Sequence, residues 1–132
     1  ATWGKAEQAV HQELVRQLGQ ATADAIVQVE GAGLSRNNRV TVEAMLHLLT
    51  RFRPHIDLLK KERGVAVKTG TLTGVYNLAG YLANGQAFVI LLNQANNARA
   101  EVLDRLTRQY AFQSTAGTGQ AGRLAPGLQS KK

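Results

Sequence analysis

The sequence predicts an α+β protein with an antiparallel sheet, in the order helix, strand, helices, three strands, helix. Two observations carry this prediction. Apolar residues recur at helical spacing in separate segments, and residues 65–92 contain short apolar runs around Asn84-Gly85, a strong β-hairpin signal. The 132 residues suffice for one core of modest size.

The first helix is predicted over about residues 5–18, where apolar side chains repeat every four positions and Gly19 suits the C-terminal cap. A polar connection then leads to residues 25–29, which are short and β-branched and therefore predict a strand. Glycines at positions 31 and 33 end that strand.

The second helix is predicted to begin after Thr41, a suitable N-cap, with Glu43 in its first turn where the helix dipole favours negative charge. Pro54 ends or kinks it. Residues 56–61 are expected to add one or two turns. A last helix is predicted over about residues 98–110.

Residues 65–70, 76–83 and 86–92 are predicted strands. A two-residue Asn84-Gly85 loop would place Tyr81 directly opposite Phe88, an aromatic cross-strand pair. The unbroken apolar run 88–92 predicts a strand covered on both faces.

Residues 1–112 are predicted to form one domain, and residues 113–132, which have little to bury, a flexible tail. The chain has no cysteine, which excludes a thiol nucleophile and a disulfide framework. It has neither a signal-peptide core nor a transmembrane segment of about 18 apolar residues. We therefore expect that a leader was removed or that the chain is a piece of a longer protein.

Sixteen Lys and Arg against nine Asp and Glu give a formal charge of +7. The basic residues are scattered and no aromatic-rich strand lies among them, so a solvated cationic surface is the preferred interpretation and no nucleic acid is expected. A basic nucleic-acid-binding domain remains the weakest alternative. His11, His47 and His55 show neither metal-ligand spacing nor a partner acid, so we expect no metal site and no cofactor.

Two polar clusters are candidate sites. Lys68-Thr69-Gly70-Thr71 places a cation and hydroxyls on a strand edge that a carboxylate can approach closely, and Ser35-Arg36-Asn37-Asn38 adds a hydroxyl and amides. Each cluster also has a purely structural interpretation. The lysine could be a solvated edge residue, the glycine a bulge, and the serine and asparagines a turn.

The two clusters resemble two of the three signatures of serine penicillin-recognising enzymes, S-x-x-K, S-D-N and K-T-G. Residues 31–38 are similar to the DGSGLSRxN segment of the D-Ala-D-Ala carboxypeptidase/endopeptidase family of low-molecular-mass penicillin-binding proteins. Residues 68–81, KTGTLTGVYNLAGY, resemble that family's third motif and the following strand. The resemblance runs from the first helix to about Tyr110.

This resemblance implies a partial penicillin-recognising serine transpeptidase/β-lactamase-like fold, and hydrolysis of the terminal D-Ala-D-Ala bond of peptidoglycan stem peptides through an acyl-enzyme. It also implies β-lactam binding and a periplasmic or extracytoplasmic location. The implied roles are a proton relay for Ser35, substrate-amide binding for Asn37, and positive potential for Lys68. Thr69 would bind the substrate carboxylate, Gly70 would allow close approach, and the Thr71 N–H would be one arm of the oxyanion hole.

The sequence departs from the family pattern at the nucleophile. None of its serines, Ser35, Ser114 and Ser130, is followed three residues later by lysine, so S-x-x-K is absent. We expect the isolated chain to be inactive, with a missing N-terminal segment of the same enzyme as its partner. The alternative is a non-catalytic peptidoglycan-peptide-binding module; an in-frame S-x-x-K upstream would favour the enzyme.

Smaller departures leave details open. The acid of DGSG is replaced by Gly31, with Glu30 one residue earlier, and either Asn37 or Asn38 could face the cleft. The glycine-rich segment that often precedes the K-T-G strand is missing, and the preference between carboxypeptidase and endopeptidase activity stays open. Without the family's N-terminal strands, residues 88–92 would expose an apolar edge and favour self-association.

Overall fold

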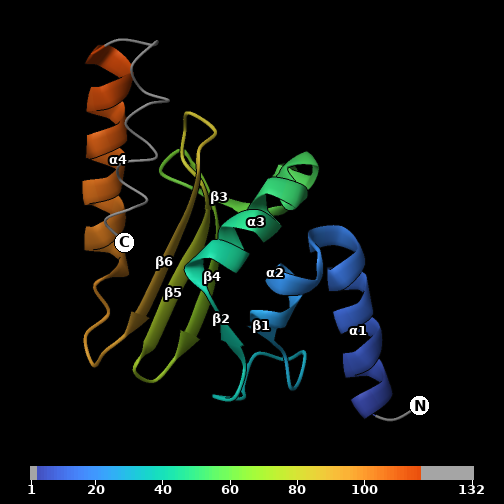
Figure 1. Ribbon diagram of the computed structural model, residues 1–132. Coiled ribbons are helices and arrows are strands. Elements are labelled where there is room, and N and C mark those ends of the chain that lie inside the picture. The colour runs from blue at the N-terminus through green and yellow to red at the C-terminus, as the bar shows by residue number, and fades with distance from the viewer. Residues whose placement is uncertain (1–2, 117–132) are drawn as a thin grey trace. The chain divides into compact units, whose positions relative to one another are not determined.

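The computed structural model describes residues 3–116, with side chains described for residues 4–110. The chain divides after Asn97 into two compact units, which are treated separately. Helices and antiparallel strands occur together, which confirms the predicted α+β class (Figure 1). Within the described span, no helix combines the length and apolar character that crossing a bilayer requires.

The first unit begins with α1 (Trp3–Leu18), which confirms the first predicted helix. It ends at Gly19, whose φ of 86° is left-handed and whose N–H donates to the Val15 carbonyl at 2.8 Å. The predicted polar connection is wrong in part, because it contains a short helix, α2 (Gln20–Asp24). Ala23 in α2 is completely buried, and this burial stabilises a helix too short to be recognised from periodicity.

A two-stranded antiparallel sheet follows. β1 (Ile26–Val27) forms within the predicted strand 25–29 but is shorter, and it pairs with β2 (Arg39–Val40). The sequence did not predict β2, because two residues are too few to show alternation. The pairing brings the two ends of the loop 28–38 together.

α3 (Val42–Phe52) begins as predicted. The Oγ1 atom of Thr41 accepts a hydrogen bond from the Ala44 N–H at 3.1 Å, which confirms the N-cap. A 3-10 helix, η1 (Arg53–Leu58), continues the chain with proline in its first turn. The turns expected over residues 56–61 therefore stop at Leu58, and the prediction is wrong beyond that point.

The larger sheet has four antiparallel strands in sequence order: β3 (Lys60–Glu62), β4 (Val65–Leu72), β5 (Val75–Tyr81) and β6 (Ala87–Asn93). β3 was missed because its residues are all charged, which is common on an edge strand but contrary to β-propensity. Arg63 and Gly64 close the β3–β4 hairpin with φ of 51° and 81°, values that suit a two-residue turn. β3 pairs only with the first three residues of β4 among the described residues.

The register of the β5–β6 hairpin differs from the prediction. Tyr81 pairs with Ala87, and Phe88 pairs with Gly80, so the predicted Tyr81–Phe88 pair is wrong. The loop has three residues, 83–85, because the left-handed Gly85 (φ 87°) occupies its last position. A slip of one residue moves a side chain to the other face, and Tyr81 and Phe88 are accordingly buried on opposite faces.

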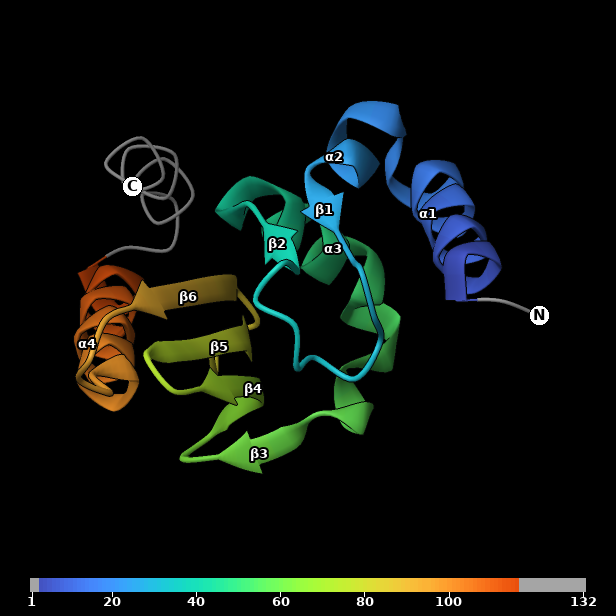
Figure 2. The same cartoon turned by 90° about the horizontal axis from the view of Figure 1, so that it is seen from below.

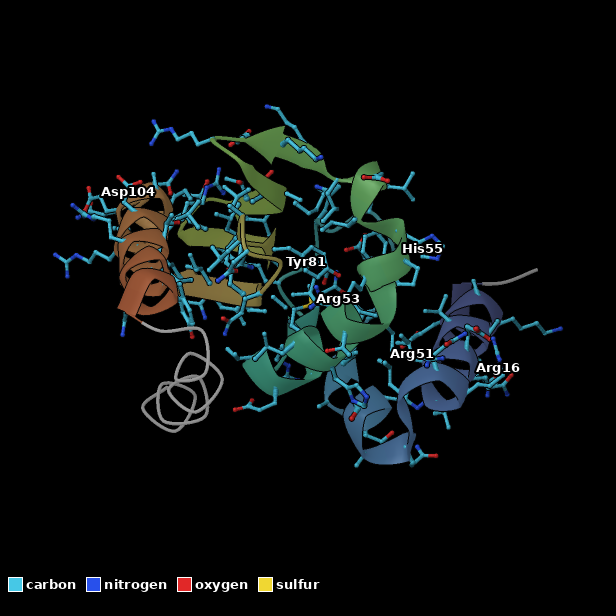
Figure 3. The ribbon with its side chains drawn as sticks, turned by 90° about the horizontal axis from the view of Figure 1, so that it is seen from above. Arg16, Arg51, Arg53, His55, Tyr81 and Asp104 are labelled. Carbon is cyan, nitrogen blue, oxygen red and sulfur yellow. The ribbon has the colours of Figure 1, made fainter. Side chains whose placement is uncertain are left out.

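One face of the larger sheet packs against α3. Its core consists of Leu49 from α3 with Ala66, Ala79, Tyr81 and Val89 from the strands. The Tyr81 hydroxyl donates to the Leu49 carbonyl. The guanidinium carbon of Arg53 lies 5.0 Å from the centre of the Tyr81 ring. Figure 3 shows these two side chains near each other.

The first part of the apolar run in β6 is covered on both faces, as predicted. Phe88, Val89 and Ile90 are all buried, so both faces are covered there, whereas Leu91 and Leu92 are half-buried.

The second unit contains α4 (Arg99–Ala116), which confirms the last predicted helix. It carries Glu101 in its first turn, where the helix dipole favours an acid. α4 includes residues 113–116, which the sequence assigned to the tail. The remainder of that predicted tail, 117–132, lies outside the described residues.

Candidate active site

A single carboxylate organises the loop between β1 and β2. The side chain of Glu30 accepts hydrogen bonds from three backbone N–H groups, those of Ala32 at 2.6 Å, Leu34 at 2.9 Å and Ser35 at 2.9 Å. It also accepts one from Asn38 Nδ2 at 2.7 Å. Four donors converging on one ionised group fix the course of a loop that has no regular structure of its own.

These hydrogen bonds lower the pKa of Glu30 below its ordinary value, and the Ser35 N–H contributes most. Desolvation of this half-buried side chain acts in the opposite direction and raises the pKa, but the hydrogen bonds together outweigh it. Glu30 is therefore ionised throughout the neutral range. Sequence reasoning noted Glu30 only as a displaced acid and did not assign it a role.

The two neighbouring asparagines have different surroundings. Asn38 is half-buried, and its Oδ1 accepts from the Val29 N–H at 2.8 Å while its Nδ2 contacts Glu30. Asn37 is exposed, and its backbone N–H donates to Ser35 Oγ at 3.1 Å. The serine and asparagine thus form the turn that the structural interpretation anticipated, and the Asn38 amide belongs to the loop's framework.

The second cluster lies on the exposed half of β4. Val65–Val67 at the start of the strand are buried, whereas Lys68, Thr69, Gly70 and Thr71 are exposed. Lys68 and Gly70 share the face that carries Ala66 and therefore α3, and Thr69 and Thr71 point to the other face. The Lys68 ammonium donates to the Thr69 carbonyl at 2.8 Å, beside the strand's own backbone.

A side chain connects the two clusters. The guanidinium of Arg36, the residue between Ser35 and Asn37, donates to the carbonyl of Thr73 at 2.6 Å. Thr73 lies in the turn between β4 and β5, directly after the Lys68–Leu72 segment. Figures 1 and 2 show the loop at the same end of the first unit as this turn.

A hollow of about 310 Å³ also joins the loop to the sheet. Glu30, Gly31 and Asn38 line it from the loop, and Asn77 lines it from β5, where it pairs with Gly70 of β4. The loop and the α3 side of the β4–β5 ladder therefore border one concave space. Ser35, Asn37 and Lys68 themselves are not among its lining residues. Ser35 and Asn37 are joined by the hydrogen bond of their turn, whereas the Lys68 ammonium bonds to the Thr69 carbonyl and not to either of them.

A larger hollow of about 620 Å³ lies elsewhere, between α1, the end of α2 and β1. It contains His11, whose Nε2 lies 3.2 Å from Asp24 Oδ1, so the expectation that no histidine has a partner acid is wrong. His47 Nδ1 lies 3.1 Å from the Thr22 hydroxyl. Within the described part of the chain, no group of three or more His, Cys, Asp or Glu side chains is arranged to hold a metal ion.

Comparison with known families identifies the class of protein. The model of the D-Ala-D-Ala carboxypeptidase 3 (S13) family matches residues 1–61 and residues 50–111, and so includes both polar clusters. The chain belongs to this peptidase family. The match confirms the resemblance noted from the sequence.

Proposed function

We propose that this chain is the C-terminal part of a serine-type D-alanyl-D-alanine carboxypeptidase/endopeptidase with a penicillin-recognising fold. It would act outside the cytoplasm on peptidoglycan stem peptides and bind β-lactams. The observation that supports this most is the Arg36–Thr73 contact, which ties the serine-asparagine loop to the end of the Lys-Thr-Gly strand. This contact supports the proposal that the two motifs, 33 residues apart in sequence, belong to one surface.

Substrate binding would depend on the exposed half of β4. A carboxylate that leaves water needs a cation or several donors. Lys68 and the Thr69 hydroxyl leave β4 on opposite faces, so they would supply these groups at the edge of residues 68–72, beyond the part of β4 that pairs with β3. The Lys68 ammonium is exposed and bonds to the carbonyl of the next residue, so reorientation toward a ligand costs little. Gly70 would let the peptide backbone lie close to the strand, as in β-strand addition.

The chemical step would need groups beyond this sequence. Ser35 would relay the proton, Asn37 would hold the substrate amide, and the Thr71 N–H would donate to the oxyanion of the tetrahedral intermediate. The nucleophilic serine and its base lysine, the S-x-x-K motif, would come from the missing N-terminal segment. The chain alone would then bind but not cleave.

Peptide binding tests this proposal. Diacetyl-L-Lys-D-Ala-D-Ala should shift the ¹⁵N-¹H resonances of residues 35–37 and 68–71, because the peptide carboxylate and amide would lie there. The same peptide with a C-terminal carboxamide is the control, and it should bind at least about tenfold more weakly because a charge-assisted hydrogen bond is lost. Equal binding of both peptides, or shifts confined to other segments, would contradict the proposed site.

Covalent labelling tests the proposal that the nucleophile does not belong to this chain. A fluorescent β-lactam should leave no adduct on the purified chain, since both the nucleophile and half of the oxyanion hole are absent. A labelled band on a denaturing gel would show that a serine of this chain reacts, and inactivity of the isolated chain would be refuted.

The absence of S-x-x-K also favours a second candidate, a non-catalytic module that binds peptidoglycan peptides. An in-frame S-x-x-K in the open reading frame upstream supports the enzyme, and a start codon immediately before this segment supports the module. The weaker alternative, a nucleic-acid binder, would show steeply salt-dependent retention on heparin.

A further inference from the structure

The geometry of the β1–β2 loop points to Glu30 as a positioning residue: we propose that its carboxylate holds the loop so that Asn37, and not Asn38, presents its amide to the substrate. This inference deepens the proposed function and rests on it for the substrate. Its structural half, that Glu30 sets the loop conformation, can be tested without any ligand.

The first argument concerns the number and direction of the hydrogen bonds. Three of the four donors to Glu30 are backbone N–H groups spread over residues 32–35, so the chain wraps around the carboxylate. Neutral acceptors in a loop rarely satisfy three main-chain donors at once, whereas an ionised carboxylate has capacity for about four. The glycine at position 33 adopts a φ of 78°, which allows this tight path.

The second argument concerns the asparagines. Both polar atoms of the Asn38 amide are used inside the loop, by Glu30 and by the Val29 N–H. Removing Asn38 from the loop to bind a ligand would leave the Glu30 carboxylate and a main-chain donor without this partner, which is costly. Asn37 is exposed, and within the described residues only its backbone N–H is hydrogen-bonded, so its amide can meet a substrate at no such cost.

The third argument concerns the connection to β4. Ser35, whose N–H is fixed by Glu30, directly precedes Arg36, which bonds to Thr73. The residue whose N–H binds Glu30 and the residue that contacts the β4–β5 turn are therefore adjacent in the chain. Loosening the anchor would let Asn37 move relative to β4.

The ligand-free test is a pH titration by NMR of the chain and its Glu30→Gln variant. In the wild type, the amide resonances of Ala32, Leu34 and Ser35 should shift together, with a midpoint below the ordinary pKa of a glutamate. The charged groups nearby are Arg36 in the loop and Arg39, which lines the same hollow. In the variant these concerted shifts should vanish, and resonances outside the loop should be unchanged.

The matched control is Glu7→Gln, which removes the same charge from the exposed surface of α1. It should leave the loop titration intact. If Ala32, Leu34 and Ser35 do not titrate together, or titrate equally in Glu30→Gln, the positioning role of Glu30 is overturned.

The ligand test uses diacetyl-L-Lys-D-Ala-D-Ala with three variants. Glu30→Gln and Asn38→Ala should lower the affinity about tenfold and also disturb the loop amides, because a charge-assisted hydrogen bond of the anchor is lost. Asn37→Ala should lower the affinity about tenfold while the Glu30 titration stays unchanged. Glu7→Gln should bind as the wild type does.

The outcomes separate the two proposals. If the wild type does not bind the peptide but the loop amides titrate together, the proposed function fails and the structural role of Glu30 stands. If the wild type binds and Glu30→Gln binds equally well, the function stands and the positioning role is refuted. Loss of affinity in Asn38→Ala without any loop change would refute the assignment of Asn37.

Discussion

At the scale of single residues, internal packing requires glycine at position 80 in β5 but not at position 70 in the neighbouring β4. A Cβ atom built on Gly80 would lie 1.9 Å from the Ala66 carbonyl oxygen, so the fold itself excludes a side chain. A Cβ on Gly70 would make an ordinary 3.6 Å contact with Asn77 Cβ. Internal packing does not require Gly70, which agrees with a glycine kept for the approach of a ligand.

We therefore predict different outcomes for Gly70→Ala and Gly80→Ala. Gly80→Ala should lower the free energy of unfolding by about 3 kcal/mol or more, because the backbone of β4 must move. Gly70→Ala should change it by less than about 0.5 kcal/mol yet weaken peptide binding about tenfold, since the methyl group stands where the peptide would lie. Urea unfolding and peptide titration measure the two quantities.

The pair controls for a general effect of adding a methyl group to the sheet. A Gly70→Ala variant that binds the peptide with unchanged affinity would remove the argument that Gly70 serves a ligand.

At the scale of elements, the bridge between the β1–β2 loop and the β4–β5 turn is a single exposed side chain. Arg36 donates to a main-chain carbonyl, so the contact does not depend on the identity of Thr73. An exposed hydrogen bond of this kind contributes little to global stability, on the order of 1 kcal/mol. We expect its main consequence to be local, because it ties the residue before Asn37 to the turn that follows β4.

We predict that Arg36→Ala speeds amide hydrogen exchange in the loop and in the β4–β5 turn, and lowers peptide affinity about fivefold, the equivalent of about 1 kcal/mol. The global free energy of unfolding should change by about 1 kcal/mol at most. Arg39→Ala, an exposed arginine on neighbouring β2, is the control and should leave exchange in the turn unchanged. Equal exchange rates in both variants would show that the bridge does not couple the two elements.

At the scale of the whole molecule, the strand order of the larger sheet decides which strand edge is open to association with another chain. β6 is the last strand and pairs with β5, and within residues 3–116 no further strand pairs with its other edge. Its residues Phe88–Ile90 are apolar and buried on both faces. An apolar strand at the end of a sheet is a template for pairing with another chain.

We predict that the chain associates in a concentration-dependent way through β6. The net charge of +7 opposes association, so added salt should strengthen it by screening. Light scattering coupled to gel filtration, at two protein concentrations and two salt concentrations, measures the effect. The variant Val89→Lys would be destabilising because Val89 is a core residue, whereas Leu92→Lys, on a half-buried position of the same strand, is a milder test.

Leu92→Lys should reduce association by placing a charge on the edge strand. A wild-type chain that stays a monodisperse monomer at high concentration and high salt would contradict pairing through β6.

The sequence by itself determined the features that depend on local chemistry. The α+β class, the N-cap at Thr41, the end of the first helix at Gly19 and the membership of a peptidase family all follow from short-range patterns. The roles of Ser35 and Lys68 in a reaction remain predictions, since they concern a substrate.

Tertiary structure decided what depends on pairing and burial. The β5–β6 register was mispredicted because the loop has three residues and ends at the left-handed Gly85, which shifts the pairing by one residue. The unbroken apolar run 88–92 has no alternation of polar and apolar residues that would reveal this shift. β3 was not predicted because its three residues are all charged and have low β-propensity. Glu30 was visible as an acid near a motif, but only folding could show that one carboxylate gathers four donors from residues two to eight positions away. Such convergence has no periodicity, because it depends on the path of an irregular loop.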